Sequence, residues 1–314
     1  MASWTNATGL AIARSASTRG LLRPAETVQT AHLAREHRVS PALHPFIERY
    51  WSVRWDLTGR PPFRSEVLSH PSVNLSIESG SAPRFGFDLP AALLHGVVTR
   101  RFTVDLTGSG RVTAIKFRPG GFRAFTGDHP GRNSVTRLTS AFGLDPVVLT
   151  AAVLAEDDDA DRAAVLDAAL VPLAPEPERA YLELQGLLGA MVEDRSLVRV
   201  DQVAALGSRS VRSLQRLFAT YLGVSPKSVL ARYRLQDAAA AIDAGSVEDL
   251  AGLAVALGWF DQAHFSRDFR AVVGMPPSVY LQRARSSTDL AICAEGSQTT
   301  GSAGERSAAS DGPA

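Results

Sequence analysis

The stretch GWFDQAHFSRDFRAVVGMPP, residues 258–277, aligns with an earlier stretch of the chain, GSRSVRSLQRLFATYLGVSP, residues 207–226. Identical residues recur at equivalent positions in and around the two stretches: Ala205 and Ala256, Leu206 and Leu257, Gly207 and Gly258, Arg216 and Arg267, Phe218 and Phe269, Gly223 and Gly274, Pro226 and Pro277, Leu230 and Leu281, Arg232 and Arg283, Arg234 and Arg285. The groups that could do catalysis do not recur, since His264 falls opposite Ser213 and Asp268 opposite Leu217. The repeat therefore indicates a duplicated scaffold and not a catalytic cluster.

Each copy predicts a helix, a turn and a second helix. In the first copy a short apolar helix ends near Gly207, and Ser210 is a suitable N-cap for the next helix. That helix extends to Gly223, because glycine readily adopts the left-handed conformation that ends helices. Pro226 then opens a third helix at a first-turn position, where its missing N–H costs nothing. The equivalent residues of the second copy are Gly258, Asp261, Gly274 and Pro277.

The second helix of each copy has an apolar stripe and an opposite polar face. The stripes comprise Val211, Leu214, Leu217, Phe218 and Tyr221 in the first copy, and Phe265, Phe269, Val272 and Val273 in the second. Arginine can form paired hydrogen bonds to guanine, and glutamine can do so to adenine, so such a face suits the major groove. The alternative is a solvated arginine face, because only Lys116 and Lys227 of the 33 basic residues are lysine. Duplication of the whole unit favours DNA.

The region from about residue 178 to residue 285 resembles the DNA-binding domain of AraC-type transcription regulators, which carry two helix-turn-helix units joined by a long helix. The matching stretches are VAALGSRSVRSLQRLF with GVSPKSVLARYRLQDA, and LAVALGWFDQAHFSRDF with GMPPSVY. As in the family, the second unit has the longer turn, since one more residue separates Ala254 from Phe265 than Ala204 from Leu214. Gly207 departs from the pattern and lies one residue before the usual turn glycine.

This resemblance implies that segments 210–222 and 261–273 are recognition helices, which would enter successive major grooves about 34 Å apart. The residues that it assigns to DNA binding are Ser210, Arg212, Gln215 and Arg216 in the first helix, and Gln262, Ala263, His264 and Arg267 in the second. Helix N-termini would contribute phosphate contacts. Lys and Arg outnumber Asp and Glu between residues 195 and 285, whereas the net charge of the chain is only +1. We expect no catalytic residues.

The preceding part of the chain has the alternation of antiparallel strands. Polar and apolar residues alternate in WSVRW (51–55) and SVNLSI (72–77), RVTAIKF (111–117) is similarly β-rich, and turn-forming pieces separate these segments. KFRPGGFRAF, residues 116–125, resembles a segment of the amino-terminal domains of one AraC-type subgroup, which are often cupin-like barrels. We therefore predict an α+β protein, with an antiparallel β sandwich or barrel and helices before an all-α domain.

A pocket in the β-rich part is a weaker prediction. Its candidate residues are Trp51, Trp55, Phe117 and Phe122, with Arg118 or Arg123 selecting an acidic effector. The alternative, which we favour, is that these aromatic residues are ordinary core. His44, His70 and His95 are too widely spaced to indicate a metal site, so no metal or other cofactor is expected.

The composition divides the chain into five parts: a flexible arm (1–39), a β-rich sensor or dimerisation domain (40–170), a Pro-rich linker (171–178), the DNA-binding domain (179–285) and a disordered tail (286–314). The only cysteine, Cys293, lies in that tail, which excludes an internal disulfide and suits a reducing cytoplasm. No apolar run is long enough for a membrane span, so no membrane partner is expected.

Three functions are compatible with these patterns. The first is a cytoplasmic, sequence-specific transcription regulator that binds double-stranded DNA, with a small-molecule effector, RNA polymerase and a second copy of the chain as candidate partners. The second is an enzyme-like barrel fused to a DNA-binding domain, which no Ser/His/Asp spacing, phosphate loop or metal cluster supports. The third is an interaction protein whose helix-turn-helix pair no longer binds DNA.

Overall fold

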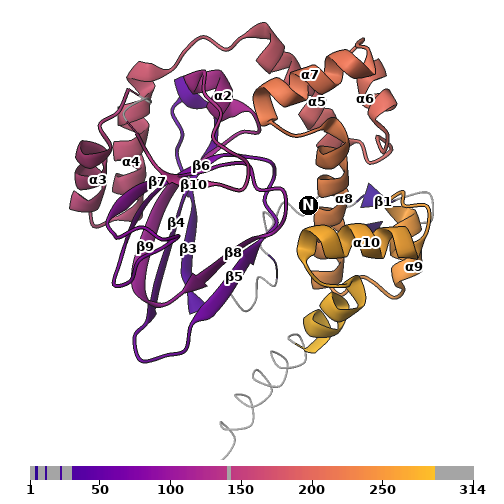
Figure 1. Cartoon of the computed structure of the whole chain (residues 1–314), viewed down its shortest axis with the longest axis horizontal. Coiled ribbons are helices and arrows are strands. Elements are labelled where there is room, and N and C mark those ends of the chain that lie inside the picture. Colours follow the sequence, from indigo (N-terminus) through magenta and orange to yellow (C-terminus); the bar gives the residue numbers. More distant parts are fainter. Residues whose placement is uncertain (1–3, 6–10, 13–21, 23–29, 140–142, 287–314) are drawn as a thin grey trace, which may run out of the picture.

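A computed structural model describes residues 4–5, 11–12, 22, 30–139 and 143–286 of the chain. It has a β-rich part and a helical part that lie side by side (Figure 1). The predicted tail, with Cys293, lies outside the described residues apart from residue 286, which is helical together with residues 277–285. Most of the predicted arm also lies outside them, but residues 32–37 of that range form a strand of the main sheet.

The β-rich part is built on a six-stranded antiparallel sheet. The strands follow the order β10 (Val135–Arg137), β7 (Ala91–His95), β6 (Asn74–Gly80), β9 (Gly108–Phe117), β4 (Ile47–Leu57) and β3 (His32–His37). A two-stranded sheet pairs β5 (Phe63–Val67) with β8 (Phe102–Leu106), and β1 (Trp4–Thr5) pairs with β2 (Ala11–Ile12). This arrangement confirms the predicted antiparallel β domain.

The two faces of the main sheet belong to different hydrophobic cores, because successive side chains of a strand point to opposite faces. On one face the cross-strand partners Tyr50, Ile115 and Leu75 are fully buried in the largest core. On the other face Trp55 and Ala114 belong to a smaller core, against which residues of β5 and β8 pack. A ligand or helix that packs on the main sheet therefore contacts the side chains of only one face.

Helices cover the first of these faces. They are α2 (Gly121–Thr126), α3 (Pro146–Ala155) and α4 (Asp159–Leu170), followed by the short 3-10 helix η3 (Val171–Leu173). Asp167 of α4 accepts hydrogen bonds from the Tyr50 hydroxyl, 2.9 Å away, and from the backbone N–H of Ser40. Asp159 forms an ion pair with Arg111 of β9 at 2.7 Å. These long-range contacts fix the helical layer on the sheet.

The helical part contains two helix-turn-helix units joined by a long helix, as predicted. After α5 (Arg179–Glu193), the first unit is α6 (Val200–Leu206) with α7 (Val211–Leu222). Helix α8 (Pro226–Asp243) leads to the second unit, α9 (Leu250–Ala256) with α10 (Gln262–Val273). The side chains of Ser210 and Asp261 accept hydrogen bonds from backbone N–H groups of α7 and α10, which confirms both N-caps. Within the described residues, no helix is long and apolar enough to span a membrane.

The largest hydrophobic core does not stop at the predicted linker. It runs from the sheet through Phe46 and Tyr181 to Leu214 and Phe218 of the first helix-turn-helix unit. The rings of Phe46 and Tyr181 stack with their centroids 5.8 Å apart, and the Tyr181 hydroxyl donates to the carbonyl of Pro45. The β-rich part and the first unit are therefore packed as one body.

Candidate nucleic-acid interface

Helix α7 presents the predicted polar face to solvent. Arg212, Gln215 and Arg216 are exposed, while Leu214 and Phe218 on the other side of the helix are fully buried. No carboxylate of the described residues forms a salt bridge with either arginine. Residues three and four positions apart share one side of a helix, so these side chains form a single cationic and amide-bearing face.

The turn before α7 has a feature that the repeat did not predict. Gly207 has a φ of −83°, and the neighbouring Ser208 takes the left-handed conformation with a φ of 49°. Arg209, also in this turn, donates to the Glu183 carboxylate of α5 and to the Ser213 hydroxyl. The hydrogen bond and charge of Arg209 lower the pKa of Glu183. The turn is thus attached to α5 by Arg209, a residue to which the sequence assigned no role.

Helix α10 presents an equivalent face. Gln262, Ala263, His264 and Arg267 are exposed, whereas Phe265 and Phe269 are fully buried. Asp268 accepts a hydrogen bond from the Trp259 indole N–H at 2.9 Å, and the His264 Nε2 lies 3.4 Å from the same carboxylate. The Arg234 guanidinium stacks over Trp259, and burial lowers its pKa to about 10. Asp268 is therefore part of the helix scaffold, and His264 stays exposed beside it.

The N-terminal part contacts the C-terminal end of α10. Arg101 lies between β7 and β8; its backbone N–H donates to Val272 O at 2.8 Å and its guanidinium to Val273 O at 2.7 Å. A second contact comes from Arg232 of α8, whose guanidinium donates to the carbonyls of Ser69 and Arg100. Burial lowers the pKa of Arg232 to about 10. Two adjacent arginines in TRRF, residues 99–102, were the only sequence signal of this contact.

The sheet separates the residues that the sequence grouped into one effector pocket. Phe117 and Phe122 lie in the largest core, with ring centroids 5.3 Å apart, and Arg118 donates to the carbonyl of His44. Trp51 and Trp55 lie on the opposite face, where their indole N–H groups donate to Asn74 and to the carbonyl of Thr107. The five side chains do not line a common cavity, because β4 and β9 direct them to two faces.

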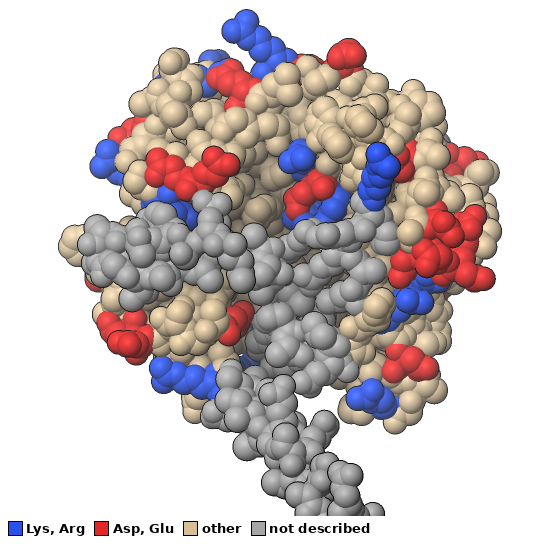
Figure 2. Space-filling model, turned by 180° about the vertical axis from the view of Figure 1, so that it is seen from behind, with Lys and Arg blue, Asp and Glu red and all other residues tan. Residues whose placement is uncertain are grey.

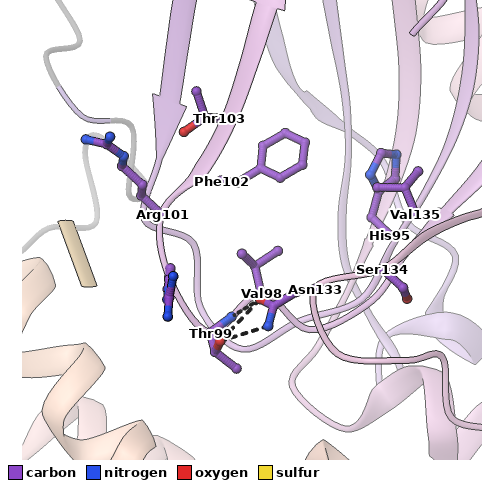
Figure 3. A pocket seen from close by; sticks show the side chains of 10 residues that line it. His95, Val98, Thr99, Arg101, Phe102, Thr103, Asn133, Ser134 and Val135 are labelled. Carbon is purple, nitrogen blue, oxygen red and sulfur yellow. Dashed lines mark hydrogen bonds between the residues drawn. The ribbon is translucent and has the colours of Figure 1, made fainter. Parts of the chain in front are cut away.

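A cavity is present at another place, between the end of β7, residues 98–103 and residues 133–135 (Figure 3). His95, which the sequence considered only as a metal ligand, lies in its wall. Among the described residues no cluster of His, Cys, Asp and Glu could hold a metal ion.

Charges are interspersed over the described part of the face in Figure 2, without a continuous basic band there.

Comparison with known families identifies the helical part. Residues 203–283 match a helix-turn-helix domain family, over both units and the helix between them. The C-terminal part of the chain is an AraC-type helix-turn-helix domain. This is a family of DNA-binding transcription regulators. Residues 35–133, in the β-rich part, match a domain of unknown function (DUF6597).

Individual relatives of the AraC-type domain are distant. An uncharacterized HTH-type transcriptional regulator from Haemophilus influenzae is 28% identical over 94 residues, which are 30% of this chain and 31% of the relative. The chain therefore spans about a third of that relative's length. The structure of ToxT from Vibrio cholerae aligns with 80% of this chain and 97% of its own, with 10% identity and a TM-score of 0.39. The C-terminal domain of AraT from Geobacillus stearothermophilus aligns with 34% of this chain and 88% of its own, with 23% identity and a TM-score of 0.31.

Proposed function

We propose that this protein is a sequence-specific transcription regulator that reads DNA with α7 and α10 in successive major grooves. The observation that carries the proposal is the pair of equivalent helices, each with an exposed face of arginine and glutamine and a buried opposite face. A single such face is compatible with simple solvation. Two of them, on units connected by one continuous helix, suit a two-groove site that one chain can occupy.

Each exposed residue has a role in this proposal. Arg212, Arg216 and Arg267 donate to guanine, and Gln215 and Gln262 pair with adenine. Ala263 contacts a thymine methyl group, and His264 donates to a base edge. Ser210 lies at the N-terminus of α7, where backbone N–H groups favour a phosphate.

In the same proposal the described β-rich part senses a small molecule or controls assembly. Its supporting feature is the way that Arg101 and Arg232 connect the sheet to the second unit. We place the division between the sensor and DNA-binding domains at residues 171–178. DNA, an effector, RNA polymerase and a second copy of the chain are the partners, and the cytoplasm is the location.

The test is capture of fragmented genomic DNA from the source organism by the full-length protein at physiological salt. Wild type should enrich a few promoter fragments, with affinity that falls steeply as salt rises. The double variant Arg212→Ala/Arg267→Ala should lose this enrichment. Arg60→Ala is the matched control, because Arg60 is exposed in the turn after β4, far from both helices in the chain.

Two outcomes would contradict the proposal. Enrichment of the same fragments by the double variant would show that α7 and α10 are not the reading elements. Absence of enrichment, both alone and with cell metabolites added, would favour an interaction protein whose helix-turn-helix pair does not bind DNA.

A further inference from the structure

The cavity at the end of β7 is a separate site in the β-rich part. Its volume is about 530 Å³, within the range of about 300–1,000 Å³ that is typical of small-molecule sites. Figure 3 shows the side chains of Phe102 and His95 at this space, together with Asn133, Ser134 and Val135. None of the residues to which the sequence assigned a role in an effector pocket lines it.

The lining has positive side chains and no carboxylate. Arg100 and Arg101 are among the lining residues, and Asp and Glu are not. Arg101 is engaged elsewhere, since it forms an ion pair with Glu66 at 3.0 Å and donates to Val273 O. Arg100 is exposed and forms no salt bridge with any described residue. It is therefore the available cation at this cavity.

The rest of the lining is part apolar and part polar. Val98, Phe102 and Val135 supply the apolar surface, and Thr99 and Asn133 bond to each other at the edge. The polar side chains of the edge are therefore held in place before a ligand arrives, and the apolar wall can receive a hydrocarbon or aromatic body.

His95 is held rigidly from behind. Its Nε2 lies 2.8 Å from the Ser76 hydroxyl and 3.4 Å from Glu78, whose carboxylate also lies 3.0 Å from the Arg84 guanidinium. Its ring packs edge-on against Phe102, with centroids 5.8 Å apart. The His95 Nδ1 is buried without a hydrogen-bond partner within the described part of the chain. A buried polar atom without a hydrogen-bond partner costs free energy, and a ligand that forms a hydrogen bond with it would remove that cost.

We propose that this cavity binds a small organic acid, with the carboxylate at Arg100 and the apolar body against Phe102. The inference deepens the proposed function and rests on it, because it names the chemical class of the effector. A carboxylate suits the free guanidinium, which can bind it with two parallel hydrogen bonds. A neutral compound of the same shape leaves Arg100 without a partner and binds more weakly.

The position of the cavity connects a bound acid to DNA reading. The segment that carries Arg100 and Phe102 also carries Arg101, which holds the last carbonyls of α10. On the other side of this segment, Arg267 and Arg270 of α10 line a second cavity together with Arg100 and Arg101. An anion bound at Arg100 therefore lies next to the residue that attaches the N-terminal part to the second recognition helix.

The experiment measures binding to the full-length protein without DNA. The probes are benzoate and hexanoate at about 10 mM, a concentration at which a ligand with a millimolar Kd occupies most of its sites. Benzamide and hexanamide are the neutral controls. Binding is followed by saturation-transfer NMR and by the rise in Tm that ligand binding causes, about 2 °C or more at this occupancy.

The variants distinguish loss of the Arg100 cation from loss of the folded structure. Arg100→Ala should abolish the carboxylate-dependent rise in Tm and leave the Tm without probe unchanged, because the Arg100 side chain is exposed. Phe102→Ala should weaken the binding of both benzoate and hexanoate. Arg60→Ala should bind both probes as wild type does. With wild type, the amides should give a smaller rise in Tm than the carboxylates.

Three results would overturn the inference: no rise in Tm and no NMR transfer with either carboxylate, an equal response to the amides, or an unchanged response in Arg100→Ala. The outcome is distinguishable from failure of the DNA proposal. Arg212→Ala should keep carboxylate binding while losing DNA affinity. Wild-type protein that binds the carboxylates but enriches no DNA fragments would contradict only the regulator proposal.

Discussion

The two helix-turn-helix units are copies in sequence but differ in what they pack against. Leu214 and Phe218 of the first unit lie in the same hydrophobic core as the main sheet. Phe265 and Phe269 of the second unit lie in a core of their own, to which the β-rich part contributes Leu68 and Leu22. The first unit is therefore part of the body that contains the sheet, and the second unit is a more separate body attached to it.

The N-terminal part nevertheless touches the same point of both recognition helices. Gly223 and Gly274 end α7 and α10 with φ values of 68° and 83°. A Cβ at Gly223 would lie 2.8 Å from the His129 imidazole, and one at Gly274 would lie 2.7 Å from the Arg101 guanidinium. The contact at α7 lies beside a continuous hydrophobic core, whereas that at α10 depends mainly on hydrogen bonds. The second recognition helix is therefore the easier one to separate from the N-terminal part.

The largest effect is expected from removal of the equivalent core rings. Phe218→Ala and Phe269→Ala each delete a fully buried phenylalanine and should each cost about 3–5 kcal/mol of stability. Phe218→Ala should destabilise the sheet and the first unit together, and Phe269→Ala should open only the second unit. Hydrogen exchange by region checks this difference. Equal loss of protection in the sheet for both variants would remove the distinction between the units.

Removal of Arg101 tests the polar attachment of α10. Arg101→Ala deletes the hydrogen bond to Val273 O and the ion pair with Glu66, and each such bond to a charged group contributes about 1.5–3 kcal/mol. The amides of α10 should exchange faster, whereas those of α7 should not change. Arg100→Ala is the neighbouring control and should leave both helices unchanged. Faster exchange in α7 as well would indicate that the two attachments are coupled.

Substitutions in the two recognition helices should change the base preference at different positions of the DNA site. Arg212→Ala and Arg267→Ala should each cost about 1–3 kcal/mol on a specific site and relax preference at different bases, as expected for loss of one bidentate contact. Binding-site selection from random DNA measures both quantities. If neither variant loses affinity on the best wild-type site, the assigned interface is wrong.

The smallest effect is expected at the turns. Ser208 holds a left-handed conformation that is unfavourable for a residue with a Cβ, by about 1–2 kcal/mol, while the second unit has Gly258 with a φ of 79°. Ser208→Gly should therefore stabilise the first unit by up to about 1 kcal/mol, after the entropic cost of glycine. Gly258→Ala should destabilise the second unit, because its Cβ would also lie 2.9 Å from Val198. Thermal unfolding of both variants is the measurement, and a lower Tm for Ser208→Gly would refute the strain.

The comparison of the two turns also shows how far sequence reasoning reached. The glycine pairs, N-caps and apolar stripes predicted both helix-turn-helix units, because each is a local feature read within one or two turns of helix. The same reasoning noted that Gly207 departs from the family pattern. It did not find Ser208 as the left-handed residue, since the backbone conformation of a serine is not visible in its identity.

The β-rich part shows the opposite case. Alternating residues predicted strands in an antiparallel sheet, and the structure confirms that class. The grouping of Trp51 and Trp55 with Phe117 was wrong, because alternation does not show which side chains of a strand face the helices. A shift of one residue in register reverses that assignment, so aromatic content alone was insufficient.

The amino-acid pattern was sufficient to predict the duplicated unit, the helix ends and the residues of each recognition helix that point away from the core. These depend on helical period and on the backbone preferences of glycine, proline and capping side chains, which act over a few residues. The folded structure was needed to show that Arg100 forms no salt bridge with a described residue while Arg101 binds the end of α10, and that His95 and Phe102 line one cavity. The reason is that these roles depend on contacts between segments far apart in the chain, whose partners no local pattern records.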